Sequence, residues 1–211
     1  MAKHPTPGQV KSRLAATLGA ETAADFQRAF VLDLAARLDA AGIAVWWAVW
    51  PPDAPFHDVV PGARVLPQEG ADLGERMGGV ARRLLAGGAG GVVLLGADVP
   101  HVHLAEVRAA VQALERGEVP VVLGPAADGG YYLLGLARLV PEIFRDVAWG
   151  RPDVRSVTEA RLGALGVAYR LVADDFDVDE PADLRRLAER LRQGDLVLPH
   201  TAAVLARAGV S

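Results

Sequence analysis

Short runs of β-branched and aliphatic residues alternate with longer amphipathic stretches, and this alternation is the strongest constraint on the fold. From Glu21 to Ala41, apolar side chains recur every four residues, which predicts a helix that stops at Gly42. Residues 43–50 (IAVWWAVW) follow, with apolar side chains on both alternating faces, as in a strand covered by helices on both sides. The alternation predicts an α/β domain with a mostly parallel sheet and helices on both faces.

The rest of the chain follows the same pattern. Predicted strands cover residues 63–66, 91–97, 119–123, 131–136 and 169–172, and predicted helices cover 72–86, 104–115, 154–165 and 181–193. Asp72 stands where a helix N-cap is expected. Residues 141–150 interrupt the pattern and predict an excursion over the sheet. We expect one domain over residues 1–211, in which the tail from about residue 196 has no assigned role.

The first strand is absent from this pattern. In doubly wound sheets a phosphate-binding loop normally follows a strand, whereas here such a loop begins at Lys3, directly after two residues. We therefore expect this chain to lack the first strand. An annotated start downstream of the natural one is the favoured explanation, and a sheet without a central strand is the alternative.

Charge and composition exclude several classes of protein. Lys and Arg total 22 against 26 Asp and Glu, and a net charge of -4 argues against a nucleic-acid partner held by a basic face. There is no cysteine, which excludes disulfides, thiolate nucleophiles and cysteine metal sites. The apolar runs are far shorter than the ~20 residues that span a bilayer, and the N-terminal residues do not resemble a signal peptide. No membrane span is expected, and a cytoplasmic location is the simplest expectation.

Both lysines of the chain, Lys3 and Lys11, lie within its first dozen residues, and arginine supplies every other permanent cation. With Gly8 and Arg13 they place three cations and several backbone amides in one loop. A polyphosphate needs such a cradle, because its distributed charge is best met by convergent N–H donors and cationic side chains. The loop is neither a Walker A loop nor a GxGxxG motif, and a solvated basic terminus is the alternative interpretation.

Several acidic residues follow predicted strands. Asp98 stands at the carboxyl end of the most apolar strand, where open α/β sheets bind ligands and where one carboxylate with phosphates can hold magnesium. A turn or N-cap aspartate is the alternative. Asp177 and Asp179 point to one side of an extended segment and offer a second metal carboxylate, with helix capping as the alternative for Asp179. His101 and His103 form a His-x-His pair, but a third zinc ligand is not evident.

A fourth motif is Asp128-Gly129-Gly130-Tyr131. Its glycines would let the backbone approach a ligand, and its tyrosine would supply stacking or a hydroxyl contact. A hairpin turn explains the glycines equally well.

Taken together, five motifs resemble one family. They are K-x-P-x-P-G-x-V-K-[ST]-R-L, Q-x-G-x-D-L-G-x-R-M, G-A-D-V-P, D-G-G-Y-Y-L-L-G-L and D-V-D-x-P-x-D-L, in this order over residues 3–187. The chain is similar to the bacterial glycosyltransferase-like family of the nucleotide-diphospho-sugar transferase superfamily, and also to the phospholactate guanylyltransferases. The departures are the absent first strand, Ser12 where Thr is usual, and His101 where Asp is frequent.

The resemblance implies a Rossmann-like GT-A domain, a divalent cation (Mg²⁺ or Mn²⁺), a nucleotide or nucleotide-sugar, and a small acceptor. Carried over by position, Lys3, Gly8, Lys11 and Arg13 would hold phosphates, and Gln68, Gly70 and Asp72 would approach the base or ribose. Asp98 would be the metal ligand, with Asp179 or else Asp177 as its partner. Asp128, Gly129, Gly130, Tyr131 and Trp149 would face the acceptor.

Three functions are open at this point. The cationic loop favours nucleotidyl transfer, in which Lys11 and Arg13 stabilise the leaving pyrophosphate while Asp98 holds the metal. Glycosyl transfer from a nucleotide-diphospho-sugar is the second, with Asp128 as the candidate general base. The third is a non-catalytic nucleotide-sugar binding protein. The sequence leaves the base, the sugar, the acceptor and the oligomeric state open.

Overall fold

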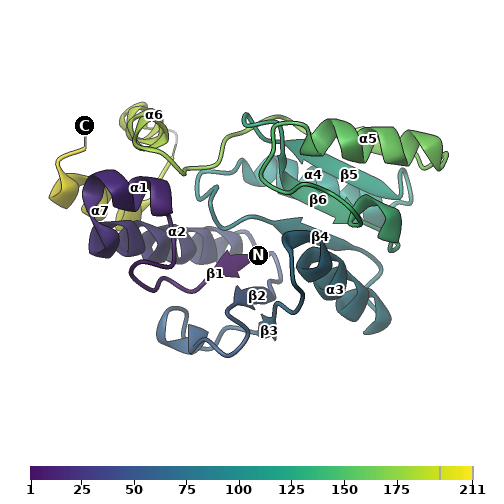
Figure 1. Ribbon diagram of the computed structural model, residues 1–211, viewed down its shortest axis with the longest axis horizontal. Helices are drawn as coiled ribbons and strands as arrows, with labels where there is room; N and C mark the ends of the chain where they lie inside the picture. Colours follow the sequence, from purple (N-terminus) through teal and green to yellow (C-terminus); the bar gives the residue numbers. More distant parts are fainter. Residues whose placement is uncertain (195, 211) are drawn as a thin grey trace. The chain divides into compact units, whose positions relative to one another are not determined.

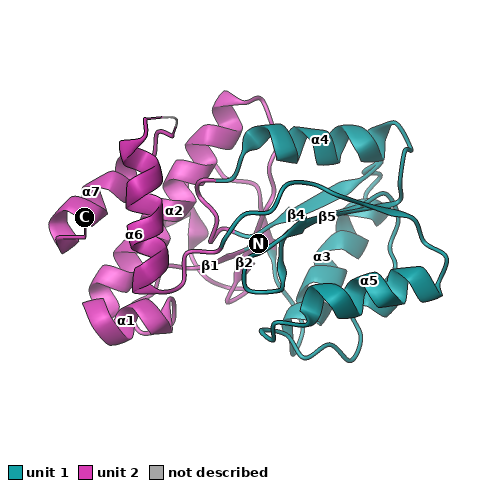
Figure 2. Cartoon of the chain, turned by 90° about the horizontal axis from the view of Figure 1, so that it is seen from above, with its two compact units in different colours: residues 1, 67–96, 102–176 teal, residues 2–66, 97–101, 177–211 magenta. Residues whose placement is uncertain are grey.

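The computed structural model describes residues 1–194 and 196–210. The chain divides into two compact units, coloured separately in Figure 2. Unit 1 comprises residues 1, 67–96 and 102–176, and unit 2 comprises residues 2–66, 97–101 and 177–211. The single domain expected over residues 1–211 stays a prediction.

Unit 1 is built on a four-stranded sheet of order β4-β6-β5-β7. Figure 1 labels β4, β5 and β6 of this sheet. The strands are β4 (Val92–Leu95), β5 (Val121–Pro125), β6 (Tyr131–Leu136) and β7 (Tyr169–Leu171). β7 pairs in parallel with β5, whereas β6 runs antiparallel to both β4 and β5. The central strands are apolar on both faces and are buried almost throughout, as strands covered on both sides should be.

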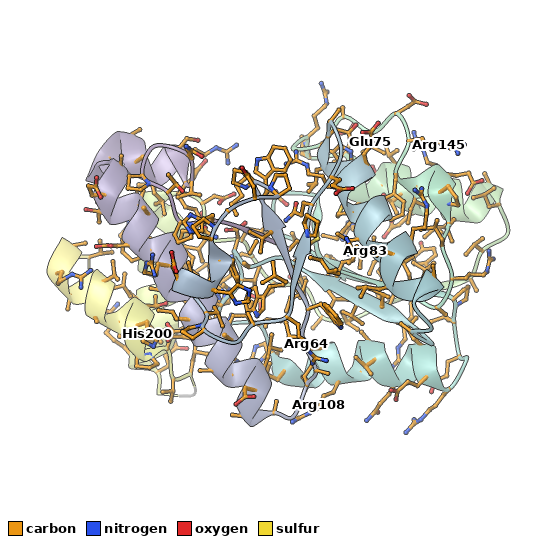
Figure 3. The ribbon with its side chains drawn as sticks, turned by 90° about the horizontal axis from the view of Figure 1, so that it is seen from below. Arg64, Glu75, Arg83, Arg108, Arg145 and His200 are labelled. Carbon is orange, nitrogen blue, oxygen red and sulfur yellow. The ribbon has the colours of Figure 1, made fainter. Side chains whose placement is uncertain are left out.

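Three helices cover this sheet. They are α3 (Leu73–Ala86), α4 (Leu104–Glu115) and α5 (Val154–Ala164), with α4 on one face and α3 and α5 on the other (Figure 2). A short 3-10 turn, Pro141–Ile143, opens the predicted excursion. Asp72 caps α3, because its Oδ1 accepts a hydrogen bond from the backbone N–H of Glu75 at 2.8 Å. The Glu75 carboxylate, labelled in Figure 3, accepts one from the amide of Ala71 at 2.8 Å.

Unit 2 combines a small sheet with a helical cluster. The sheet has the order β1-β2-β3, formed by β1 (Ala2–Lys3), β2 (Trp47–Trp50) and β3 (Val65–Pro67), the last residue of which begins unit 1. The helices are α1 (Ser12–Leu18), α2 (Ala20–Ala40), α6 (Pro181–Arg192) and α7 (Pro199–Ala208). The buried face of α2, which includes Phe26, Phe30 and Leu34, forms the core, and α1 and α7 pack against this helix. None of the helices within residues 1–194 and 196–210 combines the length and the apolar character needed to cross a membrane.

The predicted α/β class with its Rossmann-like architecture is confirmed, and one detail of that prediction is wrong. The first strand is present, since Ala2 and Lys3 pair in parallel with Val49 and Trp50 of β2. It is only two residues long, so the sequence contains no apolar run that would reveal it. The sheet of unit 1 is mixed, with β6 as its antiparallel strand.

The last helix, α7, is an element to which the sequence pattern assigned no structure. Its first amides are capped from α2: Asp33 accepts hydrogen bonds from the backbone N–H groups of His200 at 3.0 Å and Thr201 at 2.7 Å. His200 marks this end of the helix in Figure 3. Because the cap comes from a distant residue, no local cap signal precedes the helix.

Candidate phosphate- and cation-binding site

Lys11 is the centre of a buried polar network in unit 2. It is the N-cap of α1 and has a left-handed backbone, with φ 49° and ψ 48°. This conformation costs an L-residue about 1–2 kcal/mol, so it persists only where surrounding contacts hold it. Lys11 therefore stands in a strained position, which is frequent at functional sites.

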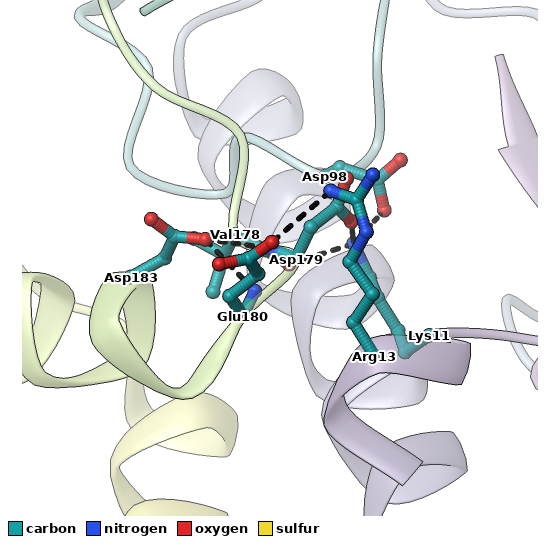
Figure 4. A network of polar contacts seen from close by, with 7 residues as sticks. All are labelled: Lys11, Arg13, Asp98, Val178, Asp179, Glu180 and Asp183. Atoms are coloured by element: carbon teal, nitrogen blue, oxygen red, sulfur yellow. Dashed lines mark hydrogen bonds and ion pairs between the residues drawn. The ribbon is translucent and has the colours of Figure 1, made fainter. Parts of the chain in front are cut away.

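The Lys11 ammonium joins three segments of the chain (Figure 4). Its Nζ donates hydrogen bonds to the carbonyl oxygen of Val178 at 2.8 Å and to Asp179 Oδ1 at 2.9 Å, and it forms an ion pair with Asp98. It also lies 5.5 Å from the centroid of the Phe30 ring. The Lys11 side chain is 3% exposed, whereas Asp98 and Asp179 are 43% and 46% exposed. The cation is thus buried behind two carboxylates that reach solvent.

Neighbouring opposite charges shift the pKa values of Lys11 and Asp179 in the directions that keep both groups charged. Burial would lower the pKa of Lys11, but the carboxylates of Asp98 and Asp179 outweigh it and raise the pKa above its ordinary value. Burial would raise the pKa of Asp179, yet the charges of Lys11, Arg13 and Lys3 hold it below its ordinary value. All three cations of the first loop therefore act on one carboxylate.

Backbone contacts position the two carboxylates. Asp98 follows β4, and its carbonyl oxygen accepts a hydrogen bond from the backbone N–H of Val178 at 3.0 Å. Asp179 precedes α6, where Asp183 Oδ2 accepts from the N–H groups of Asp179 at 3.1 Å and Glu180 at 2.8 Å. Glu180 and Asp183 form a capping box, which makes Asp183 a positioning residue; it is part of the motif D-V-D-x-P-x-D-L, but the sequence alone assigned it no role. The spacing Glu-x-x-Asp directly before an amphipathic helix is the sequence signal that could have identified this capping box.

Three further predicted residues lie in unit 2. Arg13 pairs with Glu180 at 3.4 Å, with both side chains largely exposed. Gly8 has φ 77° and open space around its Cα, so its backbone conformation, and not close packing, requires glycine. Of the two alternatives for the second carboxylate, Asp179 is the one that contacts Lys11, and Asp177 is half-buried two residues earlier.

The donor set suits a small divalent cation. Oxygens of Asp98 and Asp179 converge from separate segments on one cationic position, which Lys11 Nζ occupies here. Mg²⁺ is usually held by one or two carboxylates together with phosphate oxygens and water. Among the described residues, no group of three or more acidic or histidine side chains could hold a metal ion. Asp98 and Asp179 would supply two oxygen ligands to the implied Mg²⁺ or Mn²⁺, and phosphate oxygens and water would supply the rest.

The other predicted residues belong to unit 1. Gln68 is buried, and Gly70 has φ 137° and packs so closely on α3 that a Cβ would lie 2.6 Å from that of Glu75. Asp72 uses one oxygen as the α3 cap. The segment before α3 is thus packed closely on the first turn of that helix.

Trp149 packs on the start of α3. A Cβ on Gly74 would lie 2.7 Å from Trp149 Nε1, and the Tyr131 ring meets the Trp149 ring edge-on, with centroids 6.4 Å apart. Trp149 Nε1 is buried, and no acceptor for it is found within residues 1–194 and 196–210. Burial raises the pKa of Tyr131, so its hydroxyl stays protonated. The structure therefore places Trp149 beside the N-terminal turn of α3, with the Tyr131 ring against that of Trp149.

The Asp128 turn is shaped by packing within unit 1. A Cβ on Gly129, which has φ 90°, would lie 2.6 Å from the carbonyl carbon of Pro152. Asp128 Oδ1 accepts a hydrogen bond from the amide of Gly130 at 2.9 Å. Chain packing thus accounts for Gly129, and the second oxygen of Asp128 is the one left for other contacts.

Comparisons with known proteins agree with this fold. Residues 14–151 match the family described as "Uncharacterized protein conserved in bacteria (DUF2064)". A "putative nucleotide-diphospho-sugar transferase" from Desulfovibrio desulfuricans G20 is 31% identical, with a TM-score of 0.91 over 99% of this chain and 92% of that chain. No curated protein matches the chain.

Two more distant solved structures share the fold. A CMP:2-keto-3-deoxy-manno-octonic acid synthetase complexed with CTP is 16% identical, with a TM-score of 0.53 over 91% of this chain and 96% of that one. A 4-diphosphocytidyl-2C-methyl-D-erythritol synthase is also 16% identical, with a TM-score of 0.54 over 90% and 96%. The chain belongs to the bacterial DUF2064 family, and the resemblance to the nucleotide-diphospho-sugar transferase superfamily is confirmed.

Proposed function

We propose that the protein is a magnesium-dependent nucleotidyltransferase that acts on a nucleoside triphosphate and a small phosphorylated acceptor. One observation carries the proposal: the buried ammonium of Lys11 contacts the carboxylates of both Asp98 and Asp179. The charges of Arg13 and Lys3, which also lower the pKa of Asp179, support it. A site that gathers cations around two carboxylates suits a reaction between phosphates, whose transition state is stabilised by positioning and charge.

In this reaction, an oxygen of the acceptor phosphate attacks the α-phosphorus of the triphosphate. The bond from the α-phosphorus to the oxygen that bridges it to the β-phosphorus breaks, and pyrophosphate leaves with the electron pair. Lys11 and Arg13 stabilise the negative charge on the leaving pyrophosphate, and Lys3 with the amides around Gly8 binds the remaining phosphate oxygens. No protein nucleophile is needed.

Asp98 and Asp179 would hold the divalent cation. When bound, it neutralises phosphate charge and fixes the phosphates for in-line displacement. Asp183 keeps Asp179 in place through the capping box. Asp177 remains the alternative to Asp179.

The resemblance assigns the organic parts of the substrates to residues before α3 and around Tyr131. Gln68, Gly70 and Asp72 precede α3 and would approach the base or ribose. The acceptor would lie against Tyr131, Trp149 and residues 128–130. One of its oxygens would accept a hydrogen bond from the buried Nε1–H of Trp149.

The comparisons support the transferase class. The relative from Desulfovibrio desulfuricans G20 has a nucleotide-sugar transferase description, and one of the two distant fold neighbours is complexed with CTP. The similarity to the Desulfovibrio desulfuricans G20 protein also favours a second candidate, glycosyl transfer from a nucleotide-diphospho-sugar. Asp128 would be its general base. The two candidates differ in the nucleotide that they bind.

A thermal-shift screen of nucleoside triphosphates and nucleotide-diphospho-sugars, each with Mg²⁺ and with EDTA, tests the proposal. A ligand at about 100 times its Kd stabilises the native state by about 2.7 kcal/mol. We expect a Mg²⁺-dependent shift with one triphosphate, followed by pyrophosphate release when an acceptor phosphate is added. A shift confined to a diphospho-sugar would support glycosyl transfer, and no shift with any ligand would contradict both candidates.

A further inference from the structure

We infer that Lys11 makes divalent-cation binding at Asp98 and Asp179 conditional on the nucleotide, because its ammonium and the metal compete for the same carboxylate oxygens. The inference rests on the proposed function. It adds an order of events: the cation alone binds weakly, and the phosphates of the nucleotide draw Lys11 off the carboxylates and admit the metal.

The contacts of Lys11 carry the argument. Nζ lies 2.9 Å from Asp179 Oδ1, and it forms an ion pair with Asp98 Oδ1. One ammonium thus occupies the point at which oxygens from the two segments converge. A divalent cation that takes both oxygens must replace a hydrogen bond and an ion pair, and it would lie within a few ångströms of a buried positive charge.

The phosphates are the group suited to release Lys11. Lysine is a point charge on a flexible four-carbon stem, so Nζ can move several ångströms while its backbone stays at the start of α1. Within a polyphosphate complex it exchanges the carboxylates for phosphate oxygens, and the positive charge stays paired throughout. Asp98 and Asp179 are each about half exposed, so a cation accompanying the phosphates can reach them from solvent.

Mn²⁺ binding in the absence of nucleotide tests this directly. Free Mn²⁺ is measured by electron paramagnetic resonance during titration of the full chain and of the variants Lys11→Met, Lys11→Gln and Lys3→Met. Methionine keeps an unbranched side chain, and glutamine keeps a donor for the carbonyl of Val178. Lys3→Met is the matched control, because it removes a charge that also acts on Asp179 but leaves the contacts of Lys11 with Asp98 and Asp179 in place. Thermal unfolding of each variant checks that it is folded.

We expect Lys11→Met and Lys11→Gln to bind Mn²⁺ at least about tenfold more tightly than the unmodified protein, and Lys3→Met to differ by less than about threefold. The double variant Lys11→Met with Asp98→Asn should lose the tight binding, which places the ion at the carboxylates. Equal affinity in the unmodified protein and both Lys11 variants would overturn the inference and leave nucleotidyl transfer standing. Equal tightening by Lys3→Met would also overturn it, because the effect would then be one of general charge. Binding by none of the proteins would overturn both the inference and the proposed metal site.

Discussion

The carboxylate of Asp33 accepts a hydrogen bond from the backbone amide of Thr201 at 2.7 Å, although 168 residues separate the two in the sequence. The side chain is buried and also accepts from the amide of His200, so it caps α7 from the middle of α2. Replacing Asp33 with Ala should lower the free energy of unfolding by about 2–4 kcal/mol, because two amides at the start of a helix lose their acceptor. Urea unfolding measures the loss.

Asp25 supplies the matched control for that variant. It also joins α2 to α7, through an ion pair with Arg207 at 2.8 Å, but both side chains are more than half exposed. Asp25→Asn should therefore change the free energy of unfolding by about 0.5 kcal/mol or less. Equal losses for the two variants would contradict the capping role of Asp33.

Under the proposed nucleotidyl transfer, Lys11→Ala should lower turnover at least about tenfold while the protein stays folded, because the leaving pyrophosphate would lose a cation. Steady-state pyrophosphate release, with circular dichroism as the folding check, measures this. Arg207→Ala removes a cation outside the site and should leave turnover unchanged. Turnover of Lys11→Ala close to that of the unmodified protein would refute its role in phosphate transfer.

Two glycines of α3 should respond to alanine in opposite directions. A Cβ on Gly74 would clash with the carbonyl oxygen of Phe144 and lie 2.7 Å from Trp149, whereas a Cβ on Gly79 would be 3.7 Å from its nearest neighbour, an ordinary contact. Gly79→Ala should stabilise the protein by about 0.5–1 kcal/mol through helix propensity, and Gly74→Ala should destabilise it by about 1–3 kcal/mol through overpacking. Chemical denaturation of both variants is the measurement, and stabilisation by Gly74→Ala would contradict the close packing of Phe144 and Trp149 on this helix.

Asp183 should act through Asp179 and not through the substrate. Asp183→Ala removes the acceptor for the amides of Asp179 and Glu180, so the free energy of unfolding should fall by about 1 kcal/mol, and the apparent Mg²⁺ affinity measured with nucleotide should weaken. Asp183→Asn keeps an acceptor oxygen and should restore most of both. Failure of asparagine to rescue the Mg²⁺ affinity would indicate a direct role for the Asp183 charge instead.

Much of the fold could be predicted because its elements carry local signals. The helix over residues 104–115 and the strand over residues 131–136 have the predicted bounds, and Asp72 caps α3 as its position suggests. The missed elements lack such signals. β1 is too short to show a period, and α7 receives its cap from Asp33, which no local pattern reveals.

The candidate site was predictable as a set of residue types but not as a geometry. The clustering of lysine in the first loop pointed to Lys3 and Lys11, and position at strand ends pointed to Asp98 and Asp179. That Lys11 would lie between the two carboxylates depends on a left-handed backbone at a lysine, which sequence does not suggest. The sequence left two reasons for a glycine at position 129, a bound ligand or a hairpin turn. The structure gives a third, its close approach to Pro152, which is a tertiary contact that a local sequence pattern cannot predict.

The span of sequence between Lys11 and Asp179 has a consequence during synthesis. The ribosome makes a chain from its N-terminus, so the cationic loop and Asp98 emerge well before Asp179, 168 residues after Lys11. Until then the ammonium can pair with one carboxylate of the two, and neither the carbonyl of Val178 nor the capping box of α6 exists to complete its surroundings. The surroundings of Lys11 can therefore be completed only after Val178, Asp179 and the start of α6 have been translated.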